Sequence, residues 1–320
     1  MITILGAGVA GLCAATVLAE RGLPVQVVDS GPQGAGASWL AGGMLAPFVE
    51  AESAPPEVAR LGAGAAEWWA ARVPGVVRRG TLVLAPPRDR AELDRFAART
   101  TGHARMDPNQ IAELEPDLTG RFASALYYPD EAHLDPPRAL RSLADGLCAR
   151  GAVIRYDTQI APGQADIDCR GIAARDALPG LRAVRGEMLM LECPDVTLSR
   201  PVRLLHPRFP VYVVPRGNGL YMIGATMIES DATGPITLRS ASELMSAAFA
   251  LHPRFAEAAI VGMGSGLRPA WPDNVPRLTN VAGRWHLNGF YRHGFLTAPA
   301  LAAQLADRLT QLPQEAAFAH

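Results

Sequence analysis

The sequence predicts an α/β fold in which a doubly wound parallel sheet is interleaved with a second, α+β domain built on an antiparallel sheet. Three observations predict it. Residues 1–29 read as an apolar strand, a glycine-rich turn, a helix and a second buried strand. Between residues 185 and 225, alternating or β-branched runs are separated by proline and glycine, as in an antiparallel sheet. At 320 residues the chain is also long for one simple core.

The N-terminal turn has the GxGxxG spacing of a dinucleotide-binding unit. The strand at 1–5 runs directly into Gly6, Gly8 and Gly11, and a helix is expected at 12–21. Gly6 permits the tight turn, Gly8 lets the backbone approach a pyrophosphate, and Gly11 lets the helix pack closely on the strand. The first N–H groups of the helix are unpaired and favour negative charge. The turn therefore predicts a phosphate-binding site.

The second strand, at 24–28, ends at Asp29, which is 18 residues after Gly11. A carboxylate there accepts hydrogen bonds from a ribose diol, which argues against NADP, whereas NAD and FAD both fit. An export signal is the competing interpretation of this apolar segment. No Lys or Arg precedes the apolar run and three glycines interrupt it, so we do not expect export.

Composition excludes several classes of function. Hydrophobic residues make up 49% of the chain and charged residues 19%, as in an ordinary soluble protein, and the net charge of −1 gives no basic surface for nucleic acid or an anionic membrane. The sequence holds no lysine, which excludes Schiff-base chemistry by the protein. The histidines are scattered, so no metal is expected. The unpaired pattern of Cys13, Cys148, Cys169 and Cys193 indicates reduced thiols and a cytoplasmic protein.

The remaining elements follow from local patterns. Asp107, Pro108 and Gln110 form a capping box at a helix start, and Gly151 ends a later helix. Further helices are expected at 57–72, 88–101, 107–115, 136–150, 240–251 and 298–312, and strands at 81–84, 122–128, 152–155, 165–171, 185–192, 203–206, 211–215, 220–225, 260–267 and 285–288. We therefore assign 1–50, 137–172 and 265–320 to the nucleotide-binding domain, and 51–136 and 173–264 to the second domain.

Three further blocks separate the possible dinucleotides. They are Ala41–Pro47, then Tyr212–Arg216 with Ile223–Met227, then Gly266–Asp273 with Gly289–Gly294. Together with the N-terminal turn, and in this order, they make the sequence resemble the glycine oxidase and D-amino-acid oxidase family of flavoenzymes, in particular the glycine oxidases of thiamine biosynthesis. The resemblance implies a D-amino-acid oxidase/glutathione-reductase-like fold, a substrate-binding role for the second domain, and FAD. Because no cysteine lies in the C-terminal region where related sarcosine oxidases attach flavin, we expect non-covalent FAD.

The resemblance also assigns substrate contacts. Arg268 stands where the family's arginine holds the substrate carboxylate, a role that suits a planar guanidinium. Tyr212 matches a pocket tyrosine, Arg292 lies in a loop over the flavin and the pocket mouth, and Met44 and Met227 match pocket-lining methionines. The sequence departs from the family at four positions, which suggests a different pocket: Pro210, Val211, Trp271 and His293.

Cofactor contacts come from two sources. The turn, the acid and the following loop of small residues indicate Gly6, Gly8, Val9, Ala10, Gly11, Asp29, Ser30 and Ser38. The resemblance adds Gly42, Gly43, Met44, Gly171, Arg268, Gly289, Tyr291, Arg292, His293, Gly294 and Phe295.

The resemblance implies oxidation of glycine or another small amino acid or amine to an imine, with hydride transfer to FAD and reoxidation by oxygen. The imine would give glyoxylate and ammonia, or feed thiazole synthesis, and a homo-oligomer is expected. Three alternatives stay open at this point. They are a D-amino-acid, sarcosine or hydroxyproline oxidase or dehydrogenase of the same fold that uses another acceptor, a non-catalytic metabolite-binding protein, and an NAD-dependent dehydrogenase.

Overall fold

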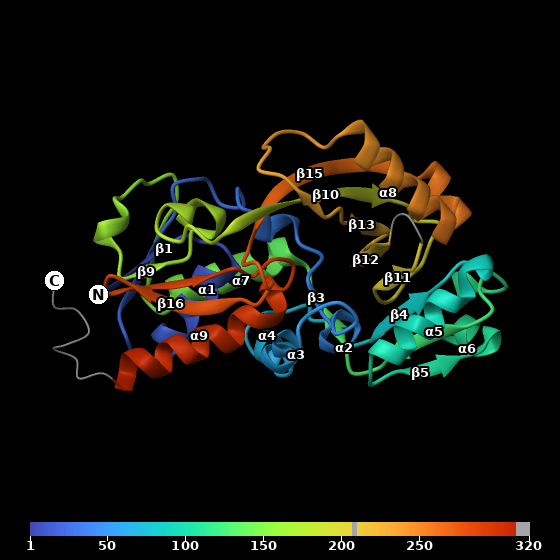
Figure 1. The fold of residues 1–320 in the computed structure, drawn as a ribbon, viewed down its shortest axis with the longest axis horizontal. Coiled ribbons are helices and arrows are strands. Elements are labelled where there is room, and N and C mark those ends of the chain that lie inside the picture. Colours follow the sequence, from blue (N-terminus) through green and yellow to red (C-terminus); the bar gives the residue numbers. More distant parts are fainter. Residues whose placement is uncertain (207–209, 312–320) are drawn as a thin grey trace.

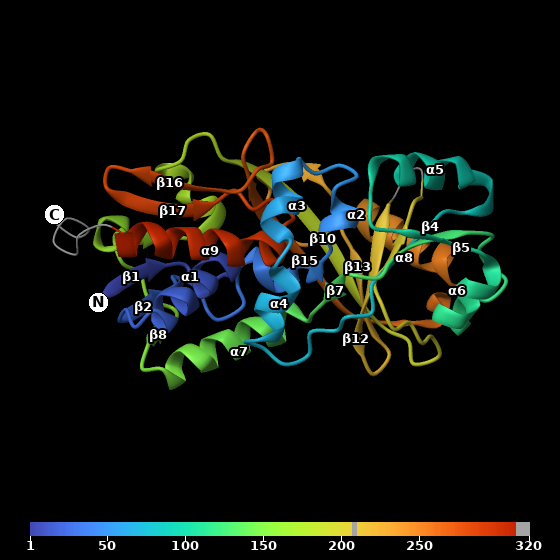
Figure 2. The ribbon, with the colours of Figure 1, turned by 90° about the horizontal axis from the view of Figure 1, so that it is seen from below.

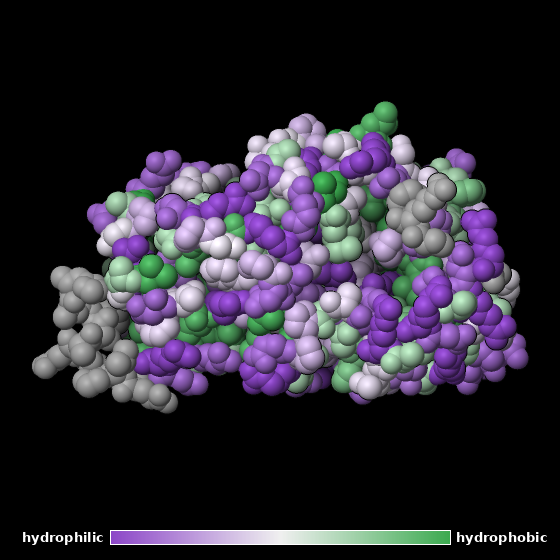
Figure 3. All heavy atoms as spheres, in the orientation of Figure 1, coloured by the Kyte–Doolittle hydropathy of each residue, from purple (hydrophilic) through white to green (hydrophobic). Residues whose placement is uncertain are grey.

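The structure, a computed structural model, describes residues 1–206 and 210–311 and contains two large sheets (Figure 1). A six-stranded sheet lies at the end of the molecule that holds the N-terminus, and a nine-stranded sheet lies toward the other end. Hydrophilic side chains are spread over the face seen in Figure 3, with hydrophobic ones in small groups between them. Among the described residues no helix is both long enough and apolar enough to cross a membrane. The predicted fold class is confirmed.

The six-stranded sheet contains the predicted nucleotide-binding strands. It is parallel except for its edge strand β16, which pairs antiparallel with β17 and was not anticipated from the sequence. In spatial order the strands are β16 (Arg277–Val281), β17 (Arg284–Asn288), β9 (Ile167–Asp168), β1 (Ile2–Leu5), β2 (Val25–Val28) and β8 (Val153–Arg155).

Three helices pack together against this sheet: α1 (Val9–Glu20), α7 (Pro136–Ala149) and α9 (Gly294–Gln311). Figure 2 shows them side by side on the face seen from below. α1 lies between the sheet and its neighbours, and its residues from Val9 to Leu18 are all buried. A helix that is apolar on all sides is stable only when it is enclosed in this way, which explains why α1 carries no charge before Glu20.

The nine-stranded sheet is antiparallel except where β11 and β4 run parallel. Its strand order is β14-β10-β13-β12-β11-β4-β6-β5. β13 and β14 pair with different parts of one edge of β10, and β15 pairs along the opposite edge. Its strands are β4 (Thr81–Leu84), β5 (Ala104–Met106), β6 (Ala125–Tyr128), β10 (Arg182–Glu192), β11 (Val202–Leu204), β12 (Val211–Gly217), β13 (Leu220–Gly224), β14 (Ile228–Glu229) and β15 (Ala259–Ala270). α8 (Leu238–Leu251) covers it and shares its apolar core. The long strands β10 and β15 extend from this sheet toward the six-stranded sheet (Figure 1).

The shorter elements are a two-stranded sheet and several small helices. β3 (Met44–Leu45) pairs with β7 (Ala132–His133), and the small helices are α2 (Pro47–Glu50), α3 (Pro56–Gly62), α4 (Ala65–Ala70), α5 (Arg90–Arg99) and α6 (Pro108–Leu114). The capping box predicted at Asp107 is present. Single 3₁₀ turns complete the described chain at Ala37–Leu40, Pro87–Asp89, Pro116–Leu118, Pro162–Gln164, Gly171–Asp176 and Pro253–Glu257.

Two predicted helices differ from the observed ones. The helix expected at 57–72 is two helices, α3 and α4, separated at residues 63 and 64, where Gly62 and Gly64 weaken the helical pattern. The helix expected from Ala298 begins at Gly294 instead and contains Pro299, while its expected end at Leu312 lies outside the described residues.

A buried tryptophan explains how α9 tolerates Pro299. Proline has no N–H, so the carbonyl of Phe295, four residues earlier, loses its helical hydrogen bond. The indole N–H of Trp69 in α4 donates to this carbonyl at 2.8 Å, and Trp69 is fully buried. The freed carbonyl is therefore satisfied from outside the helix, which allows α9 to begin before the proline.

The glycine turn has the close contact that its spacing predicts. Gly6 has φ +104°, and a Cβ atom on Gly11 would lie only 1.8 Å from the carbonyl oxygen of Gly6. α1 can approach β1 this closely only because Gly11 has no side chain.

We expect Gly11→Ala to lower the free energy of unfolding by about 1–3 kcal/mol or more, because the methyl group must push α1 away from the turn. Urea denaturation of the purified protein measures this. Gly64→Ala is the matched control, since a Cβ atom there meets nothing within 4 Å. Equal midpoints for the two variants would contradict the role of Gly11.

Candidate active site

One cavity of about 820 Å³ connects the two sheets. At one end it is lined by residues at the carboxyl ends of β1 and β2, including Leu5 and Asp29, and at the other by Met188, Tyr212 and Met222 of the nine-stranded sheet. The carboxyl ends of parallel strands are where open α/β sheets bind ligands. The cavity therefore extends from the predicted nucleotide site to the predicted substrate side chains.

The nucleotide end offers an unpaired N–H group. The Val9 amide donates to Ser38 Oγ at 3.1 Å, whereas the Ala10 amide, on the cavity wall, makes no hydrogen bond with the part of the chain that is described. Asp29 accepts hydrogen bonds from the amides of Ala7 at 2.6 Å and Gly31 at 2.9 Å, and it still lines the cavity. An unpaired amide at a helix start and an acid at the end of β2 fit the pyrophosphate and ribose of a dinucleotide.

Most of the site residues predicted from the sequence lie on the wall of this one cavity. Gly11 and Gly289 do not. Gly11 contacts the turn, as described above, and Gly289 has φ +80° and lies against Trp271, whose ring would be 2.0 Å from a Cβ atom there. Trp271 does not line the cavity either. The residues that do line it are Gly6, Gly8, Val9, Ala10, Asp29, Ser30, Ser38, Gly42, Gly43, Met44, Gly171, Tyr212, Met227, Arg268, Tyr291, Arg292, His293, Gly294 and Phe295.

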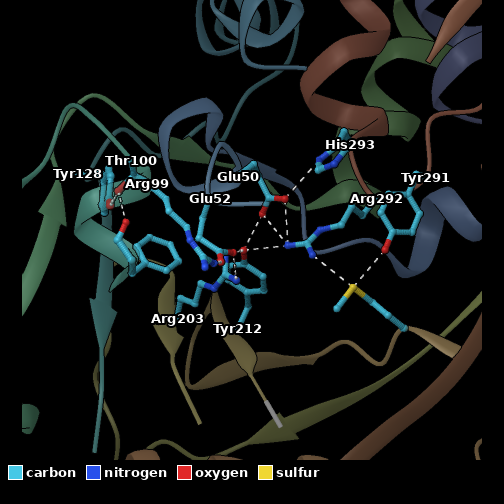
Figure 4. Close-up of polar contacts among 12 residues, drawn as sticks. Glu50, Glu52, Arg99, Thr100, Tyr128, Arg203, Tyr212, Tyr291, Arg292 and His293 are labelled. Atoms are coloured by element: carbon cyan, nitrogen blue, oxygen red, sulfur yellow. Dashed lines mark hydrogen bonds and ion pairs between the residues drawn. The ribbon is translucent and has the colours of Figure 1, made fainter. Parts of the chain in front are cut away.

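A buried carboxylate that sequence reasoning missed lies at the other end of the cavity. Glu50, the last residue of α2, accepts a hydrogen bond from the Tyr212 hydroxyl at 2.6 Å. Arg292 Nη2 lies 3.0 Å from Oε1 of Glu50 and 2.9 Å from Oε2. Figure 4 shows Tyr212, Arg292 and His293 directed toward this carboxylate from three sides. We call these four residues the Glu50 cluster.

Opposite charges keep Glu50 ionised. Burial alone would raise its pKa, but Arg292, His293 and Arg203 and the Tyr212 hydrogen bond together lower that pKa to about 2. Burial also lowers the pKa of His293 to about 4, against the attraction of Glu50, so His293 is neutral near pH 7. The positive charge beside Glu50 therefore comes from the arginines.

Arg203 binds the hydroxyl of Tyr212 from the neighbouring strand. β11 places Arg203 directly opposite Tyr212 on β12, and Arg203 Nη1 donates to the Tyr212 hydroxyl at 2.9 Å. Arg203 also pairs with Glu52 at 3.3 Å. Burial is the main cause that raises the pKa of Tyr212, so its hydroxyl stays protonated and can donate to Glu50.

Arg268 differs from the other arginines on the cavity wall. Its Nη1 donates to the Thr226 carbonyl at 2.9 Å, and its guanidinium lies over Gly186, where a Cβ atom would be 2.1 Å away. No carboxylate among the described residues lies within ion-pair distance of it. Burial and then the charge of Arg292 lower the pKa of Arg268 to about 10, so it is still a cation at neutral pH. A buried guanidinium without a counter-ion is a binding site for an anion.

A second buried acid fixes the position of Glu50. Oε1 of Glu131 accepts hydrogen bonds from the amides of Phe48 at 3.1 Å and Val49 at 2.8 Å, in the first turn of α2. A four-residue helix is not stable alone. Glu131 therefore holds the turn that presents Glu50 to the cavity.

Glu50, Arg203 and Glu131 were not predicted as site residues. Glu50 ends an otherwise uncharged run, from Met44 to Val49, directly after the Gly42-Gly43 block, and this isolated charge was the available signal. Arg203 and Glu131 have no comparable local signal. No group of three or more His, Cys, Asp or Glu side chains in the described ranges could hold a metal ion.

Comparison with known proteins agrees with this geometry. Residues 1–308 match the profile of the family described as FAD dependent oxidoreductase, DAO. A relative from Rhizobium etli, which carries the provisional name thiamine biosynthesis oxidoreductase ThiO, is 54% identical over 316 residues, covering 96% of each chain. A glycine oxidase from Pseudomonas aeruginosa is 28% identical and covers 97% of this chain and 94% of its own.

Solved structures share the fold. Glycine oxidase from Geobacillus kaustophilus has a TM-score of 0.82 and 24% identity, covering 98% of this chain and 95% of its own. An iminodiacetate oxidase from a Chelativorans species has the same TM-score and identity, covering 98% of this chain and 96% of its own. At this identity the likeness concerns the fold alone.

The position of Glu131 gives a pH prediction. Burial raises the pKa of Glu131 to about 8, which exceeds the ordinary value of 4.5 that we expect in the unfolded chain. Between these values the unfolded chain releases a proton that the folded protein keeps, so this group makes the protein less stable as pH rises. Glu131→Gln retains an oxygen acceptor for α2 and removes the titration.

We expect the free energy of unfolding of Glu131→Gln, relative to the wild type, to increase between pH 5 and pH 8 by up to about 1.4 kcal/mol per pH unit. Urea denaturation of both proteins at the two pH values measures the difference. Glu113→Gln, on the exposed side of α6, is the control. Its free energy of unfolding relative to the wild type should be the same at pH 5 and pH 8. A constant difference for Glu131→Gln would contradict the raised pKa.

Proposed function

The chain belongs to the family of FAD-dependent oxidoreductases, and we propose that it oxidises glycine or another small amino acid to the corresponding imine. FAD is its cofactor. The observation that carries the proposal is Arg268, a half-buried arginine on the cavity wall that has no carboxylate partner among the described residues. A substrate carboxylate supplies the missing counter-ion, and a two-point contact with the planar guanidinium fixes its orientation.

The chain offers two sets of groups for the cofactor. The Ala10 amide, together with Asp29, suits the pyrophosphate and the ribose, and the cavity wall continues past Gly42, Gly43 and Met44 toward Arg268. When bound, FAD supplies the acceptor for a hydride from the substrate Cα atom. That the individual residues bind it stays our prediction.

The polar side chains of the site hold charges and do not remove protons. Tyr212 stays protonated, and Glu50, with a pKa of about 2, is a weak base near neutral pH. The neutral amine form of the substrate therefore reacts without a dedicated side-chain base. Arg268 orients its carboxylate, and the Glu50 cluster closes that end of the pocket.

The atoms of the proposed reaction balance as follows. The amino acid loses a hydride from Cα and a proton from nitrogen, which leaves an imine, and water converts the imine of glycine to glyoxylate and ammonia. Dioxygen is the proposed final acceptor of the two electrons and becomes hydrogen peroxide. The name of the Rhizobium etli relative supports a place in thiamine biosynthesis, where the imine would feed formation of the thiazole.

Several expectations from the sequence stay proposals. The domain boundaries, at 1–50, 137–172 and 265–320 against 51–136 and 173–264, stay a prediction; β15 (Ala259–Ala270), a strand of the nine-stranded sheet, crosses the one at 265, and the paired strands β3 and β7 fall in different segments. Non-covalent attachment of FAD, a homo-oligomeric state and a cytoplasmic location are predictions of the same kind.

The visible spectrum tests the proposed function. We expect the purified protein to be yellow, and to lose its flavin absorbance when it is mixed without oxygen with glycine. Sarcosine and D-alanine, tested separately, identify the alternative substrates, and a dye acceptor compared with dioxygen identifies the acceptor. A yellow protein that none of these amines bleaches would refute the proposed function.

We expect Arg268→Ala to raise the KM for glycine roughly 10- to 150-fold, which corresponds to the loss of about 1.5–3 kcal/mol from hydrogen bonds to a charged group. Steady-state kinetics measures this, and the flavin content of the variant should equal that of the wild type. Arg105→Ala, which removes an exposed arginine paired with Asp94, is the control. A KM for glycine within twofold of the wild type would exclude Arg268 as the carboxylate-binding group.

A further inference from the structure

We propose that Glu50 is a specificity-determining residue that restricts the pocket to substrates with one carboxylate and excludes those with a second anionic group near Arg292. This inference rests on the proposed function, because it assumes that Arg268 holds the first carboxylate. It concerns the charge of the pocket wall, and it makes no claim about the fold.

Besides Arg170, which pairs with Asp168 and Asp176, three arginines line the cavity and could each hold an anion: Arg203, Arg268 and Arg292. Two of them already have carboxylate partners. Arg292 lies 2.9 Å from Glu50, and Arg203 lies 3.3 Å from Glu52. Arg268 alone among the three donates only to a backbone carbonyl in the described chain. The wall therefore offers one guanidinium for one carboxylate.

Glu50 also accepts the hydrogen bond of the uncharged donor at this end of the cavity, the Tyr212 hydroxyl. The Tyr212 hydroxyl donates to Glu50 Oε1 at 2.6 Å and accepts from Arg203 at 2.9 Å and from Arg292 at 3.1 Å. The Tyr212 hydroxyl and Nη2 of Arg292 are thus turned toward a carboxylate of the protein (Figure 4), while Nη1 of Arg292 and the Tyr291 hydroxyl contact the sulfur of Met227. A second substrate carboxylate would find these donors occupied and would face the negative charge of Glu50, which disfavours binding.

Replacing this carboxylate by an amide reverses the preference. Glu50→Gln keeps an oxygen that can accept from Tyr212, but it leaves the buried charge of Arg292 without a counter-ion. A buried cation that has lost its partner favours any anion that can reach it. Arg292 would then bind the second carboxylate of a suitable ligand.

The probes are oxydiacetate and its monoamide, which have the same size and shape and differ by one negative charge. Neither contains an amine, so both bind without being oxidised. Each is titrated into the flavin-containing protein while the change in flavin absorbance is followed. We expect the wild type to bind the monoamide at least roughly tenfold more tightly than oxydiacetate. Equal affinities, or tighter binding of oxydiacetate, would overturn the inference without any variant.

The variant gives the second test. In Glu50→Gln we expect the affinity ratio of oxydiacetate to monoamide to rise at least roughly tenfold over the wild type. The double variant Glu50→Gln/Arg292→Gln should return the ratio toward the wild-type value, because the cation that captures the second carboxylate is gone. A ratio that does not change in Glu50→Gln, or a gain that survives in the double variant, would overturn the inference.

A matched control distinguishes the effect of removing the negative charge of Glu50 from the effect of removing a buried carboxylate elsewhere in the protein. Glu115→Gln removes a buried carboxylate that pairs with Arg200 at 2.6 Å and does not line the cavity, so it should leave the ratio unchanged. A similar rise in this control would count against Glu50. Turnover of glycine tests the proposed function separately, because the two probes report binding alone and keep their preference even if no amine reduces the flavin.

Discussion

The buried contact between Glu50 and Arg292 is the interaction on which the shape and charge of the pocket depend. Taking an unpaired charge out of water is costly, so the two groups are stable inside the protein only together. Glu50 comes from α2, Arg292 from the turn before α9, and Tyr212, which bonds to both, from the nine-stranded sheet. One carboxylate thus joins α2 and the turn before α9 to the nine-stranded sheet.

The positions of Glu50 and Arg292 depend in turn on two buried residues that do not line the cavity, Glu131 and Trp69. Glu131 accepts hydrogen bonds from the amides of Phe48 and Val49 in α2, and so fixes the direction in which Glu50 points. Pro299 leaves the Phe295 carbonyl without its helical hydrogen bond, and the Trp69 indole N–H donates to that carbonyl instead. This allows α9 to begin at Gly294, two residues after Arg292. A helix that began at Ala298 would leave residues 294–297 without helical hydrogen bonds and Arg292 on a longer loop. Both ends of the ion pair are therefore fixed by buried polar groups, as a precise site requires.

Local patterns in the sequence were enough to predict the nucleotide-binding turn, most strands and the capping box, because each depends on residues close together in the chain. The side chains of the pocket could be anticipated only where the resemblance supplied them, as for Arg268 and Tyr212. Glu50 could not be found this way, since its partners lie 162 and 242 residues further along the chain. β16 was missed for a related reason: its residues are half-exposed and its pairing with β17 follows a short turn at Ala282 and Gly283, both at positive φ. The start of α9 was misplaced because the partner of the Phe295 carbonyl is a tryptophan from another helix.

The backbone alone cannot decide which substrate the pocket accepts. Glycine oxidase from Geobacillus kaustophilus and the Chelativorans iminodiacetate oxidase share this fold at the same TM-score of 0.82, and a shared fold does not fix a substrate. In this chain Glu50 supplies the negative charge beside Arg292, and the Tyr212 hydroxyl links Arg203 and Arg292. Arg268 stands outside that set with only a backbone partner among the described residues. If Arg268 holds the substrate carboxylate as proposed, selectivity follows from which guanidinium the protein leaves without a counter-ion.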